Sequence, residues 1–274
     1  MKETPLFPPF LYQKSIPSVL WCYTGAGYCF EENFEQIVKL NRESIPLCII
    51  FSSAGAIVAN RYGFFWNICQ NPLEKDFIHF IFENKDVLRY NIKKLLDSTK
   101  FSYSFAPNDP SYSSAVSLAN NEAVVCIIGS PITANTAAKL ASGIADTYIT
   151  NLIAQGLKAG KKIGIFPTDT VFPEVMSLLP IRYRGNPSSK KVDPKICQFN
   201  AIRNLSSNQI DFLAQYCVGC HQCVKILPEI FSSAKKQKIK IRKIDAQNAA
   251  KLEDDFTIFT KPSEIHNFVK QYFK

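Results

Sequence analysis

The sequence predicts an α/β protein built on a parallel sheet. Three apolar runs without any charge predict buried strands, because strands that are covered on both faces are apolar throughout. A short turn of small and polar residues follows each run, and helical spacing begins after the turn, which is the order of a right-handed parallel unit. The three runs are Ser18–Tyr23, Pro46–Phe51 and Val124–Ile128.

The first turn contains Thr24, Gly25, Ala26 and Gly27. A glycine turn between a strand and a helix can bind a phosphate through its backbone N–H groups. Phe30 stands where the dinucleotide fingerprint G-x-G-x-x-G requires its third glycine. This departure argues against NAD and leaves room for a mononucleotide.

The other two turns are rich in hydroxyl and amide side chains. Ser52 and Ser53 follow the second run. After the third run, Gly129-Ser130-Pro131 is expected to end the strand and a polar turn is expected to open a helix. Open parallel sheets bind ligands at such strand ends, where helix amino ends favour anions. The alternative is that these residues only cap helices. The candidate residues of the third turn are Ser130, Thr133, Asn135 and Thr136.

The rest of the sheet region follows the same pattern. Apolar residues recur at helical spacing from Ile144 to Leu157, and Lys162–Phe166 predicts a fourth buried strand. Phe77–Phe82 predicts another strand, within which His79 is expected to be structural. Residues 101–113 predict a turn-rich loop whose aromatic side chains could cover a ligand.

Composition limits the class of protein. A chain of 274 residues with 46% hydrophobic content is long enough for one large domain and an appendage. Its apolar runs fall short of the roughly 20 residues of a membrane span, and prolines and charges interrupt the first 17 residues, unlike a signal peptide. The sequence has no nucleic-acid motif. We therefore expect a soluble, cytoplasmic protein with no membrane partner.

The positive charge is concentrated in the last third of the chain. From Gly185 onward there are fifteen Lys and Arg against eight Asp and Glu, a balance of +7 out of the total of +9. Such an excess usually forms a solvated basic face. The alternative is an acidic protein partner or an anionic substrate.

Four of the nine cysteines form a cluster of their own. Cys217, Cys220 and Cys223 follow the spacing C-x₂-C-x₂-C of bacterial ferredoxins, whose fourth cysteine would fall at Leu227. In two-cluster ferredoxins the fourth cysteine of one run binds the other cluster, so Cys197 is expected to complete the set. We expect one 4Fe–4S cluster. Zinc is the alternative, with His221 able to replace one thiolate, and an absence of metal is the second.

Several segments resemble the FMN-binding flavoprotein superfamily. SPITANTAAKLASGIAD is similar to the segment that lines flavin and phosphate in flavin-dependent cysteine decarboxylases, flavin prenyltransferases and archaeal flavoproteins. LWCYTGAGYCFEENFE, IIFSSAGAIV and the C-terminal segment resemble the archaeal branch, related to dihydromethanopterin reductase (acceptor). The resemblance implies a Rossmann-like sheet that binds FMN. It implies that the phosphate lies at Thr24–Gly27, Ser52 and Ser53, and that Ser130, Thr133, Asn135 and Thr136 line the flavin.

The same comparison with the superfamily shows a departure. The decarboxylases use a histidine base and a methionine-asparagine motif, whereas this chain has PTDTVFP after the fourth strand. Decarboxylation is therefore disfavoured, and no catalytic residue is identified. The expected domains are a flavoprotein domain (1–181), a ferredoxin-like iron–sulfur insertion (182–238) and a C-terminal segment that packs back on the first domain (239–274).

These observations together predict an FMN-dependent oxidoreductase. Electrons would enter through the iron–sulfur cluster from a ferredoxin-like donor, reduce FMN and leave to an organic acceptor, for which the family suggests a dihydropterin. The alternatives are a flavin-bound decarboxylase or prenyltransferase with a structural metal, and an electron-transfer flavoprotein without a substrate. The family resemblance also implies a homotrimer or a larger homo-oligomer.

Overall fold

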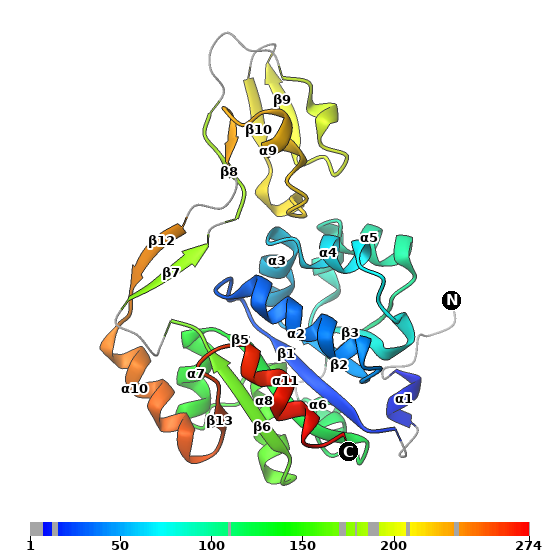
Figure 1. Ribbon diagram of the computed structural model, residues 1–274, viewed down its shortest axis with the longest axis vertical. Helices are drawn as coiled ribbons and strands as arrows, with labels where there is room; N and C mark the ends of the chain where they lie inside the picture. Colours follow the sequence, from blue (N-terminus) through cyan, green and yellow to red (C-terminus); the bar gives the residue numbers. More distant parts are fainter. Residues whose placement is uncertain are drawn as a thin grey trace.

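The computed structural model describes residues 8–12, 16–108, 111–169, 174–178, 180–185, 192–206, 209–232 and 236–273. A seven-stranded sheet with the order β13-β6-β5-β1-β2-β3-β4 forms its centre, and all of its pairings are parallel (Figure 1). This is the α/β class that the apolar runs predict. The strands are β1 (Ser18–Tyr23), β2 (Leu47–Phe51), β3 (Ile78–Phe82), β4 (Ser102–Phe105), β5 (Val124–Ile132), β6 (Lys162–Pro167) and β13 (Thr257–Ile258).

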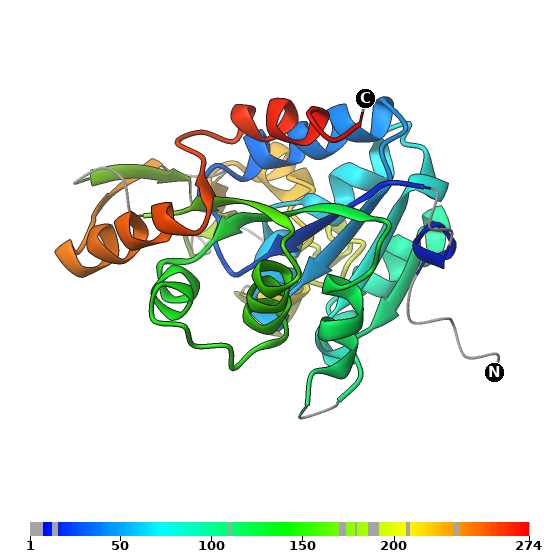
Figure 2. The ribbon, with the colours of Figure 1, turned by 90° about the horizontal axis from the view of Figure 1, so that it is seen from below.

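Helices cover both faces of the sheet (Figure 2). Alternate strand residues feed two cores: Trp21 packs into an aromatic core on one face, and Leu20 packs into an aliphatic core on the other. The aromatic core is covered by α2 (Phe30–Arg42), α3 (Ser53–Arg61), α4 (Phe64–Gln70), α5 (Ile92–Thr99) and α11 (Ser263–Lys270). The aliphatic core is covered by α1 (Pro9–Tyr12), α6 (Ser113–Ala119), α7 (Ala134–Ala141) and α8 (Tyr148–Lys158). Within the described residues, no helix is both long enough and apolar enough to cross a membrane.

Three local expectations were wrong. β5 does not end at Gly129 but continues through Ser130 to Ile132, which pairs with Pro167 of β6. The expected helix over 144–157 begins only at Tyr148, as α8, because residues 142–147 connect it to α7 and a capping box between Thr147 and Thr150 starts it. The expected loop over 101–113 contains β4, an edge strand that forms because it pairs with β3.

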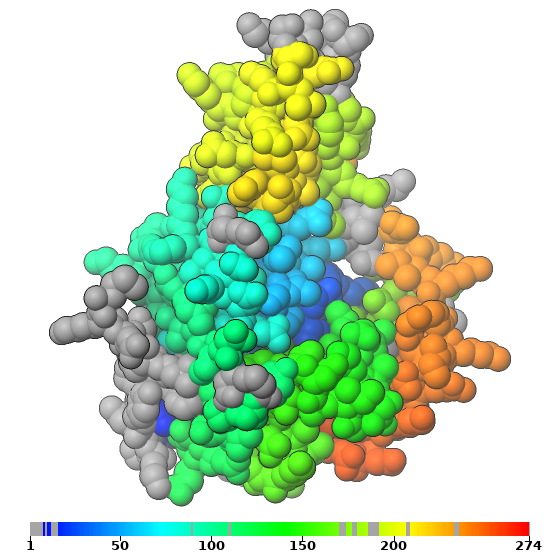
Figure 3. Space-filling view, turned by 180° about the vertical axis from the view of Figure 1, so that it is seen from behind, coloured from blue at the N-terminus to red at the C-terminus, as the bar shows by residue number. Residues whose placement is uncertain are grey.

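The cysteine-rich segment has a small core of its own. It stands above α3, α4 and α5, as the yellow part of Figures 1 and 3 shows. This packing supports, as a proposal, the division of the chain at about residues 182 and 238. The elements of the segment are β8 (Arg182–Tyr183), η3 (Pro194–Ile196), β9 (Ile202–Ser206), β10 (Gln209–Phe212), η4 (Ala214–Tyr216), α9 (Gln222–Ile226) and β11 (Phe231–Ser232).

A two-stranded arm joins this segment to the rest of the protein. β7 (Glu174–Leu178) leads out of the sheet region and β12 (Lys236–Lys240) leads back, and the two strands pair in antiparallel fashion. The chain then forms α10 (Lys243–Lys251), which packs against α7, and η5 (Leu252–Asp254) before it returns to the sheet through β13. The remaining short elements are η1 (Lys75–Phe77) and η2 (Lys85–Arg89).

The cysteine-rich segment contacts α3 through a pair of glycines. A Cβ placed on Gly219 would lie 2.5 Å from the backbone nitrogen of Gly63 and 2.9 Å from the carbonyl oxygen of Arg61. Two side-chain amides support this contact. Asn60 donates to the carbonyl of Cys217 at 3.3 Å, and Asn91 donates to the carbonyls of Phe199 and Tyr216 at 3.1 and 2.9 Å.

Gly219→Ala is expected to loosen this contact. The change would cost roughly 1–2 kcal/mol for a side chain at a positive φ and roughly 1–3 kcal/mol more for overlap with Gly63. Gly143→Ala is the matched control, because Gly143 has a φ of 68°, against 66° for Gly219, but no atom within 4 Å of the added Cβ. Hydrogen exchange of residues 197–223 should increase in Gly219→Ala alone. Equal exchange and equal melting temperatures in the two variants would show that the contact does not hold the segment.

Candidate functional site

The order of the strands places a ligand crevice between β1 and β5. The chain runs outward from β1 through β2 and β3 to β4 and then returns to β5 on the other side of β1. In open parallel sheets, ligands bind at the carboxyl ends of the strands where the order reverses in this way. The turns that flank this point are Thr24–Gly27 and Thr133–Thr136. The sequence singled out both.

Thr24 joins these two turns directly. Its hydroxyl donates to the carbonyl of Pro131 at 3.3 Å and accepts the backbone N–H of Thr133 at 2.8 Å, and its own backbone N–H donates to Pro131 at 3.2 Å. Thr24 is 5% exposed. Its side chain therefore holds the two turns of the crevice together.

The second turn packs against the first. A Cβ on Gly25 would lie 3.0 Å from the Cβ of Ala54, and a Cβ on Gly55 would lie 2.3 Å from the carbonyl oxygen of Tyr23. Gly55 is therefore required by the close approach of α3 to the end of β1. The hydroxyl of Ser52 accepts the N–H of Gly55 at 3.0 Å and caps α3.

A carboxylate of the protein already occupies the amino end of α3. Glu83, which follows β3, accepts from the backbone N–H of Ser53 at 2.9 Å and from its hydroxyl at 3.3 Å. It also accepts from the backbone N–H of Tyr148, the first residue of α8, at 3.3 Å. A phosphate at α3 would have to displace this negative charge, so Ser53 is poorly placed for an anion.

The amino end of α7 is open by comparison. Thr133 caps it by accepting the N–H of Thr136 at 3.2 Å, and its first turn contains no acidic residue. Asn135 is exposed, and its amide has no hydrogen-bond partner among the residues that the structure describes. Of the residues predicted for the flavin site, all but Ser130 lie at one edge of the sheet. Ser130 is buried in β5 and donates its hydroxyl to Asn33 of α2.

Three residues that the sequence analysis did not select lie next to this edge. Tyr28 follows the β1 turn, Tyr62 follows α3, and Asp169 follows β6. Tyr28 and Tyr62 line a cavity of about 390 Å³, together with Gly27, Cys29, Phe30, Glu31, Glu32, Arg61, Met176, Pro180, Ile181, His221 and Lys236. No local motif marks these residues. The sequence signal was that PTDTVFP, residues 167–173, replaces the family's methionine-asparagine motif. Residues 170–173 of this segment lie outside the described residues.

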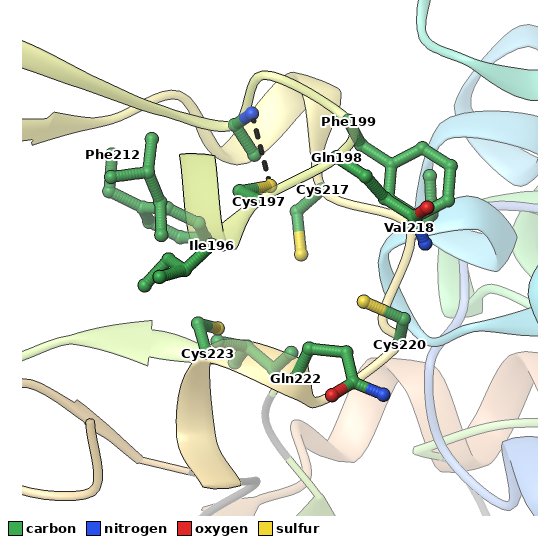
Figure 4. Close-up of a pocket in the computed structure, with 13 residues that line it drawn as sticks. Ile196, Cys197, Gln198, Phe199, Phe212, Cys217, Val218, Cys220, Gln222 and Cys223 are labelled. Atoms are coloured by element: carbon green, nitrogen blue, oxygen red, sulfur yellow. Dashed lines mark hydrogen bonds between the residues drawn. The ribbon is translucent and has the colours of Figure 1, made fainter. Parts of the chain in front are cut away.

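The four selected cysteines line a second cavity of about 280 Å³ (Figure 4). Cys197 follows η3, Cys217 follows η4, and Cys220 and Cys223 lie before and within α9. Their sulfur atoms point into the shared space. The Sγ of Cys197 also accepts the backbone N–H of Ala201 at 3.3 Å. His221 lines the other cavity and not this one, so it is poorly placed to replace a thiolate.

The thiols lie close together, but not at the spacing of a single-ion site. Burial, and then the nearby Cys217, Cys220 and Cys197, raise the pKa of the Cys223 thiol to about 12. Among the described residues, however, no group of three or more His, Cys, Asp or Glu side chains is arranged to hold one metal ion. Four sulfurs at about 2.3 Å from one zinc would lie within about 4 Å of one another.

The fold is that of an α/β protein with a parallel sheet and a crevice at its carboxyl edge, where open parallel sheets bind ligands. The chain belongs to the flavoprotein family, whose model, described as Flavoprotein, matches residues 11–177. This finding confirms the superfamily that the sequence segments indicated.

Relatives of known name match nearly the whole chain. The dihydromethanopterin reductase (acceptor) of Methanocaldococcus jannaschii is 30% identical over 257 residues, which cover 91% of this chain and 94% of the relative. The enzyme of the same name from Methanosarcina mazei is 23% identical, with 92% and 98% covered. The crystal structure of Burkholderia xenovorans DmrB in complex with FMN, described as a cubic protein cage for redox transfer, has a TM-score of 0.54. It is 17% identical, over 94% of this chain and 96% of DmrB, and so shows a shared fold.

Asn135→Ala and Thr24→Val are expected to lower flavin occupancy by different routes. Asn135 has no described partner, so its loss should change stability by less than about 0.5 kcal/mol while it removes a ligand contact. Thr24→Val leaves the N–H of Thr133 unpaired, so it should cost about 1–3 kcal/mol of stability and distort the crevice without unfolding the protein.

The measurement is the ratio of bound flavin to protein after purification, with thermal unfolding alongside. Asn120→Ala is the control, because Asn120 is exposed at the end of α6, away from the crevice. Full occupancy in both Asn135→Ala and Thr24→Val would place the flavin elsewhere.

Proposed function

We propose that this protein is an FMN-dependent oxidoreductase that receives electrons through an iron–sulfur centre and passes them by way of flavin to an organic acceptor. Membership of the flavoprotein family, the FMN complex of DmrB and the names of the two reductases support the flavin and the reaction class. A flavin can accept electrons one or two at a time, so it can couple a one-electron centre to a two-electron acceptor.

The observation that carries this proposal is the position of the two sites at opposite ends of α3. The amino end of α3 packs on the turn after β1, through Gly55 and Tyr23, and thus borders the crevice. Just beyond its carboxyl end, Gly63 contacts Gly219, between Cys217 and Cys220. The nine residues of α3 span about 14 Å at 1.5 Å per residue. The length of α3 therefore indicates the distance between the crevice and the cysteine cavity, which electrons would have to cross.

The size of the cysteine cavity favours a cluster over zinc. A cavity of about 280 Å³ has several times the roughly 30 Å³ that one water molecule occupies in the liquid. One ion would leave most of it empty, whereas a group of several atoms would fill it. Cys197, Cys217, Cys220 and Cys223 would then each hold one iron of a 4Fe–4S cluster, and the N–H of Ala201 would tune the cluster through the Cys197 sulfur.

The histidine within the central sheet, His79, is a poor candidate for the base of a decarboxylase. His79 of β3 is buried, and its Nδ1 and Nε2 lie 2.9 and 2.8 Å from the hydroxyls of Ser102 and Ser104. Burial lowers its pKa to about 4. Both nitrogens are engaged, so His79 supports the pairing of β3 with β4, as the sequence analysis expected.

The partners follow from the relatives and from the charge of the chain. The relatives named dihydromethanopterin reductase favour a dihydropterin as the acceptor. The excess of fifteen Lys and Arg over eight Asp and Glu from Gly185 onward favours an acidic, ferredoxin-like electron donor. The cage described for DmrB favours a homo-oligomer, a trimer or larger.

An anaerobic absorption spectrum of the purified protein tests the cofactors directly. Flavin bands together with broad iron–sulfur absorption are expected. Flavin bands alone, with zinc found by metal analysis, would overturn the cluster and favour the structural-metal alternative.

Cys197→Ser tests the fourth ligand. A 4Fe–4S cluster needs one ligand for each iron, so the variant should contain less iron per protein and should bleach in air faster than the parent. Flavin should stay bound and remain reducible by chemical reductants, but reduction by an external ferredoxin should fail.

Cys69→Ser is the matched control. Cys69 lies outside the cavity, where its Sγ is 3.4 Å from the Leu95 carbonyl and from the Thr99 hydroxyl, contacts that serine can retain. Unchanged iron content and ferredoxin-linked activity in Cys197→Ser would remove Cys197 from the ligand set.

A further inference from the structure

Asp169 has a constrained backbone and a carboxylate oxygen without a partner. It follows β6 at the carboxyl edge of the sheet and has a φ of 59°, in the left-handed region, where a residue other than glycine costs roughly 1–2 kcal/mol. Its Oδ1 is shielded from solvent and has no hydrogen-bond partner among the described residues. The residue as a whole is half-buried, so the carboxyl group is not sealed in the core. Strain and unpaired polar atoms of this kind are concentrated at functional sites.

The groups that face Asp169 come from three parts of the chain. Tyr28 and Cys29 lie in the turn before α2, Tyr62 follows α3, and Asp245 lies in α10, where it is paired with Arg242 at 2.7 and 2.8 Å. Residues 170–173, which follow in the chain, are Thr, Val, Phe and Pro and carry no carboxyl or basic group. Burial, and then the charge of Asp245, raise the pKa of Asp169 above its ordinary value of 3.8.

The same tyrosines form the wall of the 390 Å³ cavity. Tyr28, Cys29 and Tyr62 line it and also interact electrostatically with Asp169. The lining includes Gly27, which belongs to the crevice turn, and His221, which belongs to the cysteine-rich segment. The cavity thus borders both the crevice turn and the cysteine-rich segment. Its volume falls within the range of roughly 300–1,000 Å³ typical of small-molecule pockets.

We propose that the organic acceptor binds in this cavity against Tyr28 and Tyr62, and that Asp169 donates the proton that accompanies its reduction. This inference rests on the proposed function. In a dihydropterin the reducible bond is a C=N bond. The hydride, with its electron pair, comes from reduced flavin and forms a C–H bond at the carbon. The proton passes from the carboxyl group of Asp169 to the nitrogen. The C=N π bond breaks, a C–NH single bond remains, and the carboxylate of Asp169 regains a proton from water.

The tyrosines are weaker candidates for this step. Burial, and then Cys29, raise the pKa of Tyr28 to about 12, and burial raises the pKa of Tyr62. A higher pKa makes a phenol a weaker acid, whereas it brings a carboxyl group closer to the pH at which it must donate. Their role is therefore to hold the planar acceptor, and the carboxyl group supplies the proton.

The test compares Asp169→Asn with the parent protein. Asparagine keeps the size of the side chain and tolerates a positive φ, so folding should be retained. Each protein is loaded with FMN and reduced chemically, and its reoxidation by 6-methyl-7,8-dihydropterin is followed by stopped flow across a pH series. Asp169→Asn should be about 100-fold slower or more, the usual contribution of a general acid, with unchanged FMN occupancy and unchanged affinity for the probe.

The pH profile separates proton donation from a structural role. In the parent, the rate should fall as the pH rises through the raised pKa of Asp169, and this dependence should be absent in Asp169→Asn. Asp245→Asn removes a neighbouring negative charge, so it should move the fall to lower pH. Asp97→Asn, a change at the exposed end of α5, should leave the profile as it is.

An infrared measurement on apoprotein, which contains no flavin, completes the test. The infrared difference spectrum between apoprotein of the parent and of Asp169→Asn should contain a protonated-carboxyl band that titrates above the usual range of aspartate. Absence of this band would overturn the proposal. A loss of FMN in Asp169→Asn would also overturn it and make Asp169 a flavin ligand. If the parent reduces the probe and Asp169→Asn is reoxidised equally fast, the donor role fails while the proposed function stands. If the parent itself does not reduce the probe, the proposed function fails, and the donor role with it.

Discussion

The crevice depends on the hydrogen bonds of one side chain, the hydroxyl of Thr24. It joins the ends of β1 and β5, the two strands between which the order of the sheet reverses, by accepting from Thr133 and donating to Pro131. Without it, the backbone N–H of Thr24 would still donate to Pro131, but the N–H of Thr133 would lose its partner across the crevice. The close packing of Gly55 on Tyr23 adds the turn after β2 to the same unit. The candidate ligand groups are therefore held by contacts within the protein, before any ligand binds.

The charges around the crevice make some parts of its edge favourable for an anion and others unfavourable. Glu83 satisfies the amino ends of α3 and α8, whereas the amino end of α7 has no carboxylate in its first turn. A phosphate is therefore favoured at α7. Asp169, which follows β6, and the tyrosine-lined cavity suit a neutral heterocycle better than a second anion. One edge of the sheet thus offers two unlike environments a short distance apart.

The sequence predicted the features that depend on local pattern. Apolar runs marked the buried strands, small polar residues marked the turns, and cysteine spacing marked a set that the fold gathers around one cavity. It missed what depends on distant pairing. β5 continues past Ser130 because β6 pairs with it, and Glu83 reaches helices that start 30 residues before and 65 residues after it. Asp169 interacts electrostatically with Tyr62, which follows α3, and with Asp245 of α10. The motif predicted that Ser130 lines the flavin, and the structure adds that its hydroxyl donates to Asn33 of α2.

The antiparallel arm has a consequence for how such a chain could arise. Leu178 lies opposite Lys236, so the chain leaves the sheet region and returns to it at neighbouring points. Two strands paired in this way need only a short turn to join them, so everything between them is, in topological terms, an expanded hairpin loop. A long loop adds little to the entropic cost of closing a hairpin. A flavoprotein sheet could therefore gain the whole cysteine-rich segment in one step and keep every one of its strand pairings.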